Sequence, residues 1–412
     1  MSRAELAEAA NAWLWEQRGE RFDLDARAIA RYERGAVRWP GAHYRAALRH
    51  VLNAPDDAAL GFRPAGQSGH PIKAEQPVAL LLPGSVELGV SPAEFVSQVV
   101  LETPVPTRAC LIEVDQVRAT TAALARSENL FGGGLSSEAA AAQLRWASRL
   151  LGAQSPNRVR AGLLEAVGNL AGVVAFSAFD IGAHAAAARC FRFALWCADE
   201  GGSWELRAAT LADMSRQAVH LGRLDEGLSL IEFAQVRADR LTTTTRAMLG
   251  TVRARLLACL GRSADALAEM SRADSFFTSS DTTAAPPWLT YYDWAEHLGS
   301  SARVFVPVAV TERRSGEAGT RLAAAIGLHS DAYPRSRALS RARLATLTMK
   351  IGDPREAAAI GRIAIIESAS MHSTRMVGEL QALHDVSVDH SDIPEVAELT
   401  HDLTTAVGSA GS

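Results

Sequence analysis

The chain has 412 residues, 48% of them hydrophobic, and a formal net charge of −4. It is too long for one ordinary hydrophobic core, so we expect two or more domains, or a small domain joined to a repeat array. The net charge excludes a uniformly basic surface for nucleic acid, and any affinity for DNA has to come from a local cluster.

The first element expected along the chain is a helix that begins after Ser2. Ser2 and Glu5 have the spacing of a capping box, in which each side chain accepts a hydrogen bond from the backbone N–H of the other residue. The helical pattern then continues through Glu16.

A second, short helix is expected within residues 25–39, stopped by Gly35. Ile29 and Tyr32 are three residues apart and can face a core. The opposite side carries arginines at spacings of four, three and four residues: Arg27, Arg31, Arg34 and Arg38. Residues 27–49 contain six arginines and a single acidic residue, so positive charge is concentrated here.

Residues 29–35, Ile-Ala-Arg-Tyr-Glu-Arg-Gly, resemble the recognition helix of the repressor/Cro-type (XRE) helix-turn-helix family of transcriptional regulators. Residues 2–9 resemble the helix that precedes it in that family. The expanded turn between the two, and the Arg-Trp-Pro that follows, are similar to regulators of high-GC bacteria. Members normally carry another helix before these two. Because the chain starts at Met1, we expect either a start further upstream or a domain that lacks its first helix.

The resemblance implies contacts with double-stranded DNA. Five arginines are the expected DNA-binding residues: Arg3, Arg27, Arg31, Arg34 and Arg38. By position in the motif, Arg27 and Arg31 would lie nearest to base edges, and the arginines that follow would bind phosphates. Glu33 would be structural. A solvated helix face is the alternative interpretation of the same arginines.

A third helix is expected after Pro40, because apolar residues follow it at helical spacing as far as Leu52. Residues 60–62, Leu-Gly-Phe, should complete a helix-turn-helix domain over residues 1–62.

A proline-rich linker is expected at residues 63–107. Residues 55–106 contain eight of the sixteen prolines of the chain. Within the linker, an apolar segment at 78–82 and a short helix from Ser91 are expected.

Residues 108–410 predict a long series of helices. Turns of apolar residues followed by glycine recur at four positions: Gly182, Gly222, Gly261 and Gly352. The intervals are 40, 39 and 91 residues, and the last leaves room for a degenerate turn at 314–316. A unit of two antiparallel helices every 35 to 45 residues cannot bury its apolar face alone and has to stack on its neighbours.

Residues 222–227 and 352–357 resemble the turn and second-helix start of the tetratricopeptide repeat. The resemblance covers about residues 155–385. It implies an all-α fold in which an α-solenoid of helical hairpins forms a right-handed superhelix with a concave face. Aromatic residues are concentrated at 176–204 and 288–294, where most are expected in the core and a few in the concave groove.

Other motifs carry weaker signals. Residues 131–138 contain three glycines in a row without the Lys-Ser/Thr ending of a phosphate-binding loop, and a flexible turn is the better interpretation. The His and Asp residues of 384–392 have no known metal-site spacing and favour a polar loop.

The four cysteines form no CxxC pair, which indicates a reducing compartment, and Cys190 and Cys197 are expected in the core. The longest apolar run, 170–179, is too short to span a membrane.

These patterns predict a cytoplasmic DNA-binding transcriptional regulator with no catalytic residue, cofactor or metal. Two heads are expected because one small domain with about four arginine contacts binds DNA weakly at physiological salt. The resemblance implies that the repeat domain forms the homodimer, binds a peptide or small-molecule effector, or does both. The alternative is a protein-interaction scaffold with a degenerate DNA-binding head, which the absent first helix favours.

Overall fold

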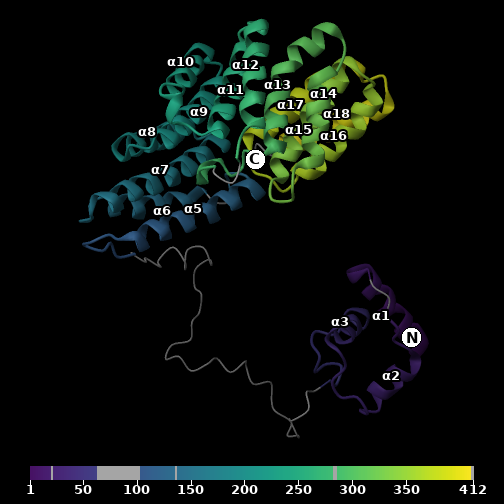
Figure 1. The fold of residues 1–412 in the computed structure, drawn as a ribbon. Helices are drawn as coiled ribbons and strands as arrows, with labels where there is room; N and C mark the ends of the chain where they lie inside the picture. The colour runs from purple at the N-terminus through teal and green to yellow at the C-terminus, as the bar shows by residue number, and fades with distance from the viewer. Residues whose placement is uncertain (20–21, 63–102, 135–136, 282–284, 410–412) are drawn as a thin grey trace. The chain divides into compact units, whose positions relative to one another are not determined.

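The computed structural model describes residues 1–19, 22–62, 103–134, 137–281 and 285–409 (Figure 1). Within these ranges the regular elements are helices, and the one β-type contact is an isolated bridge between Arg108 and Gln154. The fold is therefore all-α, as expected. The chain divides into two compact units, Met1–Val100 and Leu101–Ser412, which are described separately. The apolar segment at 78–82 and the helix from Ser91 lie outside the described residues.

Three helices form the first unit: α1 (Arg3–Arg18), α2 (Ala26–Glu33) and α3 (Ala42–Val51). The predicted capping box is present, because the Ser2 hydroxyl accepts from the Glu5 N–H and the Glu5 carboxylate accepts from the Ser2 N–H at 2.6 Å. One core joins the three helices and the segment after α3: it contains Ala10, Leu14, Ile29, Ala47, Leu48 and Phe62.

The α2 helix ends earlier than the arginine spacing suggests. Gly35 adopts a left-handed φ of +68°, which residues with a side chain rarely adopt, and the helix stops at Glu33. Arg34 caps the helix, and Arg38 lies in the turn that follows. The prediction that Arg38 lies on the helix face is therefore wrong, because a helical spacing has no meaning beyond the residue that ends the helix.

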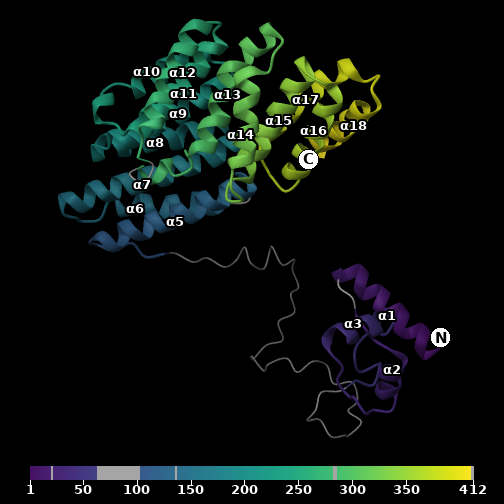
Figure 2. The same cartoon turned by 45° about the vertical axis from the view of Figure 1, so that its right-hand side comes forward.

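The second unit consists of helices that follow one another along the chain (Figure 2). They are α5 (Leu111–Phe131), α6 (Ser137–Leu150), α7 (Asn157–Asp180), α8 (His184–Gly201), α9 (Trp204–His220), α10 (Leu224–Ala234), α11 (Thr243–Cys259), α12 (Ser263–Thr278), α13 (Trp294–Glu312), α14 (Gly316–Leu328), α15 (Pro334–Ile351), α16 (Pro354–Ser368), α17 (Thr374–Ser387) and α18 (Pro394–Ser409). Short 3-10 turns at Ala238–Arg240, Pro287–Leu289 and Val388–His390 lie between some of them. Pro104, which precedes α5, contacts this unit, because its carbonyl accepts from the Trp146 indole N–H at 3.3 Å.

Glycine turns separate the paired helices where the sequence places them. Gly182, Gly222 and Gly261 have φ of +81°, +74° and +75° and connect α7 to α8, α9 to α10 and α11 to α12. Gly352 connects α15 to α16, and the degenerate turn falls between α13 and α14. The helices of each pair pack against one another. The core between them contains many alanines, which allow close approach of the backbones.

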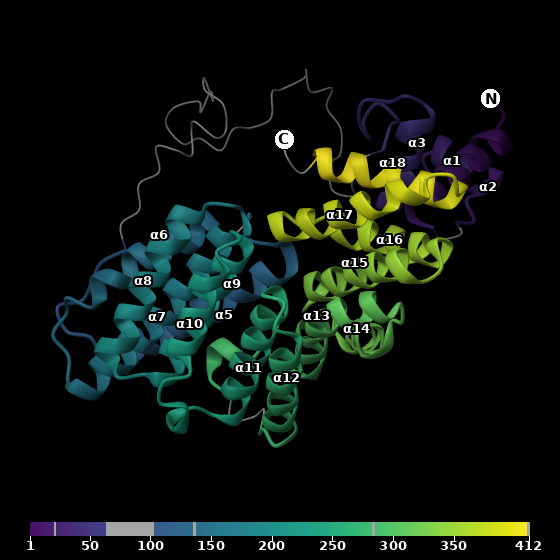
Figure 3. The ribbon, with the colours of Figure 1, turned by 90° about the horizontal axis from the view of Figure 1, so that it is seen from above.

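Helices from the start of this unit contact helices near its end (Figure 3). Arg335, on α15, donates to both oxygens of Glu128 on α5 and, at 3.0 Å, to Asp180 at the end of α7. The same Asp180 carboxylate accepts from Ser373 at 2.8 Å and from Arg375 at 2.7 Å. These contacts span 155 to 207 residues, so tertiary packing closes the unit in a way that the local periodicity does not predict.

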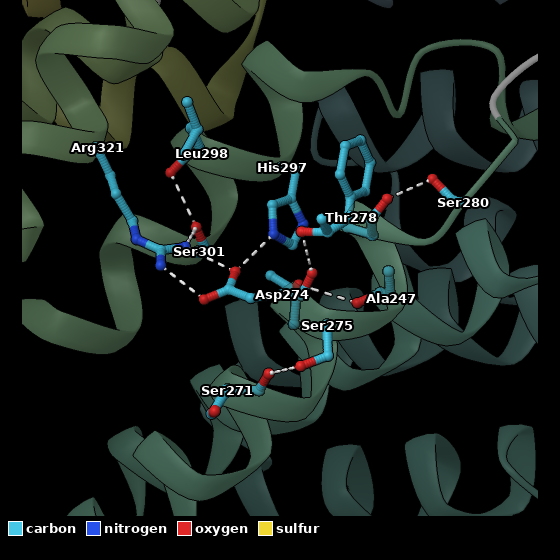
Figure 4. A network of polar contacts seen from close by, with 12 residues as sticks. Ala247, Ser271, Asp274, Ser275, Thr278, Ser280, His297, Leu298, Ser301 and Arg321 are labelled. Carbon is cyan, nitrogen blue, oxygen red and sulfur yellow. Dashed lines mark hydrogen bonds and ion pairs between the residues drawn. The ribbon is translucent and has the colours of Figure 1, made fainter.

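A polar network joins α12, α13 and α14 (Figure 4). Asp274 accepts from Arg321 at 2.7 and 2.9 Å and contacts the His297 ring at 2.8 Å. His297 is fully buried and stacks on Phe277, with 4.4 Å between the ring centroids. Burial alone would raise the pKa of Asp274, but the hydrogen bonds from His297 and Arg321 lower it to about 2.

The α7 helix is long and apolar enough to cross a membrane by its composition. In the fold, 67% of its most apolar 18-residue window is buried. Helices from the core of a globular unit have the same properties. Cys197 is buried as expected, whereas Cys190 is only partly buried.

Candidate functional site

The first candidate site is the basic surface of α2 and the turn after it. Four of the expected DNA-binding residues are exposed and have no ion pair or side-chain hydrogen bond within the described residues: Arg27, Arg31, Arg34 and Arg38. The neighbouring Arg45 and Arg49 pair instead with Asp57, at 2.8 and 3.3 Å. Among the arginine side chains of this unit that the structure describes, the unpaired ones are thus those of α2 and the turn after it.

Several contacts fix α2 against the rest of its unit. The Asp25 carboxylate caps the helix by accepting from the Ala28 N–H at 2.7 Å. The Asn11 side chain bonds to both backbone groups of Leu24, at 2.8 and 3.1 Å, and so joins α1 to the start of α2. Ile29 is 2% exposed, which anchors the inner face of the helix. Arg27 and Arg31 therefore extend from a helix that is fixed on its inner face, and Arg34 and Arg38 follow its end.

Arg3, the fifth expected contact, takes part in a different interaction. Its guanidinium pairs with Glu33 at 2.7 Å, and both side chains are about half exposed. This pair joins the start of α1 to the end of α2. Glu33 is thus engaged within the unit, in agreement with the structural role expected for it.

The second candidate site is a cavity of about 860 Å³ in the second unit. Its wall comes mainly from the first helix of successive pairs: α5, α7, α9, α11, α13, α15 and α17. Four residues of the two aromatic-rich segments line this cavity: Phe176, Phe179, Trp288 and Tyr291. The Trp288 indole N–H is buried and has no partner within the described residues.

The cavity wall is rich in arginine. Eight arginines line it, against four carboxylates: Arg118, Arg126, Arg216, Arg255, Arg303, Arg335, Arg343 and Arg375 against Glu128, Asp213, Glu296 and Glu379. The wall also has apolar parts, formed by residues such as Val173, Leu206, Met248 and Leu339. A cavity of this size with partly apolar walls is typical of a small-molecule binding site, but its twelve charged residues are more than such sites usually have.

Sequence reasoning did not identify these arginines, although a signal was present. Arg216 and Arg255 each lie six residues before a turn glycine, at Gly222 and Gly261. They therefore occupy equivalent positions in α9 and α11, and both side chains line the cavity. The high arginine content of the whole chain concealed this pattern.

The glycines of the three-glycine segment are packed against other parts of the chain, and residues 135–136 of the same segment lie outside the described residues. The Gly133 N–H donates to the buried Asp180 carboxylate at 3.0 Å. A Cβ at Gly133 would overlap the Ser177 carbonyl, and one at Gly132 would overlap the His372 carbonyl. The turn needs glycine because other backbones pass against it.

The His and Asp residues of 384–392 lie at the end of α17 and in the turn after it. His384 pairs with the adjacent Asp385 at 3.5 Å. Within the part of the chain that the structure describes, no group of three or more His, Cys, Asp or Glu side chains is arranged to hold a metal ion.

Comparison with known proteins gives no further information on either site. No protein-family model matches the chain, and no curated protein matches its sequence.

Proposed function

We propose that the chain is a cytoplasmic DNA-binding transcriptional regulator. In this proposal the first unit is an XRE-type helix-turn-helix head with α2 as its recognition helix. The second unit is an α-solenoid of tetratricopeptide-like hairpins that binds an effector and joins two copies.

One observation carries the proposal. Four arginines on and just beyond α2 are exposed and unpaired within the described residues, while the inner face of the same helix is held by Ile29 and the Asp25 cap. Unpaired guanidiniums on a rigid helix suit both bidentate contacts with base edges and ion pairs with phosphates. A merely solvated surface has no need for charges of one sign so close together.

The cavity supports the second part of the proposal. Its wall draws on seven helices, so a bound ligand can alter how successive pairs pack. If two copies are joined through this unit, such a change can alter the spacing of two heads. Sedimentation velocity at micromolar concentrations tests this part, and a monomer under those conditions contradicts it.

Fluorescence anisotropy with labelled DNA from upstream of the chain's own gene tests the head. We expect the double variant Arg27→Ala/Arg31→Ala to lose specific binding without loss of helix content by circular dichroism. The matched control is Arg262→Ala, which removes an exposed arginine of the second unit that pairs with Asp265 at 2.7 Å. It should bind as the wild type does.

The same titration is run with a version extended upstream of Met1. Absence of DNA binding by both versions at low salt would contradict the regulator proposal and favour an interaction scaffold. Normal binding by the double variant would show that α2 is not the recognition helix.

A further inference from the structure

Three arginines of the cavity wall surround a single carboxylate. Arg255 lies on α11, Arg303 on α13 and Arg343 on α15, and Glu379 lies on α17. Arg343 Nε is 2.8 Å from Glu379 Oε1, and Arg303 Nη2 is 3.7 Å from the same oxygen. Arg255 has no ion pair or side-chain hydrogen bond within the described residues, so its charge has no direct partner there.

The electrostatics of this arginine cluster show a shortage of negative charge. Burial and the charge of Arg343 lower the pKa of Arg255 to about 10. Burial and the neighbouring Arg255 and Arg343 lower the pKa of Arg303 well below its ordinary value. Burial alone would raise the pKa of Glu379, but Arg343 and Arg303 hold it at about 2. Glu379 is therefore ionised at neutral pH, and because guanidinium groups keep their protons in proteins, three positive charges lie near one negative charge.

Other arginines of the same wall are better compensated. Arg216 pairs with Asp213 at 2.5 Å. Arg335 and Arg375 share the carboxylates of Glu128 and Asp180. Arg126 also has no ion pair within the described residues, but its side chain is exposed; among the partly buried arginines of the wall, the uncompensated charge is therefore in the arginine cluster.

A small recess adjoins the arginine cluster. It has a volume of about 40 Å³ and shares Arg216, Met248, Arg255, Ser300 and Arg303 with the wall of the large cavity. One polar head group near the mouth of this recess would contact guanidiniums from α11 and α13. The apolar parts of the large cavity are then available to the body of the same molecule.

We propose that the arginine cluster binds the carboxylate or phosphate group of a small organic anion whose apolar body occupies the large cavity. Guanidinium groups bind both kinds of oxyanion through charge-assisted hydrogen bonds, and they do so more strongly where water is partly excluded. The inference rests on the proposed function only in treating the cavity as the effector site. It requires no binding of DNA.

Isothermal titration calorimetry of the full chain at constant ionic strength tests the proposal with four probes. Sodium octanoate and octyl phosphate present the two head groups on one apolar body, inorganic phosphate presents a head group alone, and 1-octanol presents the body alone. We expect the two octyl anions to bind at least about tenfold more tightly than inorganic phosphate or 1-octanol. A preference between the two octyl anions identifies the head group and supports the proposal.

Two variants locate the site. Arg255→Met and Arg303→Met keep a long apolar stem and remove the charge, and each should weaken the octyl anions at least about tenfold. The matched control, Arg262→Met, removes an exposed arginine just beyond α11 and should leave the affinity unchanged. Thermal unfolding without a ligand shows whether each variant is folded. Arg255→Met should unfold at the same temperature as the wild type or higher, because it removes an uncompensated charge.

Failure of both octyl anions to bind with a Kd below about 1 mM would overturn the proposal. So would equal affinity in Arg255→Met, Arg303→Met and Arg262→Met. A lower unfolding temperature of Arg255→Met together with unchanged anion affinity assigns that arginine to stability and also overturns it. These measurements are made without DNA. A negative result would therefore not affect the test of DNA binding by the first unit.

Discussion

Replacement of Asp274 by asparagine tests the energetics of the buried network in the second unit. The Asp274 carboxylate accepts two hydrogen bonds from Arg321 and contacts the His297 ring (Figure 4). Its pKa is about 2, whereas the ordinary value is 3.8. This difference corresponds to about 2 kcal/mol of folding free energy. The side chain is only 30% exposed, so solvent screens the interaction to a limited extent.

The sign follows from the direction of the pKa change. Because the folded-state pKa lies below the unfolded-state value, the ionised carboxylate stabilises the fold above about pH 4, and this stabilisation is lost as the pH falls towards 2. We expect Asp274→Asn to lower the free energy of unfolding by about 2 to 3 kcal/mol at pH 7. At pH 3 roughly half of that difference should persist.

Urea denaturation followed by both circular dichroism and tryptophan fluorescence measures the difference, provided that the two probes give coincident transitions. The matched control is Asp265→Asn on the same helix, whose side chain is 56% exposed and should contribute less than about 0.5 kcal/mol. A variant as stable as the wild type at pH 7 would refute the reasoning. A difference that stays constant between pH 7 and pH 3 would refute the role of the ionised carboxylate.

Three further predictions concern the closure of the second unit, the glycine turn and the head. Arg335→Met should destabilise the unit by about 3 kcal/mol or more in thermal or urea unfolding, because it leaves the buried Glu128 and Asp180 carboxylates short of a partner. The control is Arg362→Met, which removes a partly exposed arginine that pairs with the exposed Glu398 at 2.9 Å, and equal loss of stability in this variant would contradict the closure contact. Gly133→Ala should lower the free energy of unfolding by about 2 kcal/mol or more, because the added Cβ would overlap the Ser177 backbone. The control is Gly172→Ala, within a helix, where no atom lies within 4 Å of the added Cβ. It should leave the stability unchanged or raise it by up to about 1 kcal/mol. If Gly133→Ala and Gly172→Ala have the same stability in unfolding measurements, the glycine turn is not packed as described. Arg34→Ala should reduce the slope of log K against log salt by about one per head in anisotropy titrations with any duplex, because Arg34 is expected to bind a phosphate, and an unchanged slope would remove Arg34 from the DNA contacts.

The sequence by itself determined the local features of this protein. Ser2 and Glu5 determined the start of α1, because a capping box depends on residues three apart. Gly182, Gly222 and Gly261 determined the turns of three helix pairs, because a left-handed φ selects glycine wherever it occurs. The spacing of the apolar residues predicted the all-α class, because helical periodicity depends only on residues that are close in the sequence. The end of α2 at Glu33, short of Arg38, was also encoded in Gly35, but the arginine spacing obscured it.

Only the tertiary structure decided which charges meet. Arg335 contacts Glu128 across 207 residues, and Arg255, Arg303, Arg343 and Glu379 come together from four different helices. Each of these side chains fits an exposed helical face equally well in the sequence. Their meeting depends on how successive helix pairs pack, and a small rotation at each pair accumulates over the array. Burial then changes the energetics of the same groups, because the cost of an unpaired charge depends on how much water surrounds it.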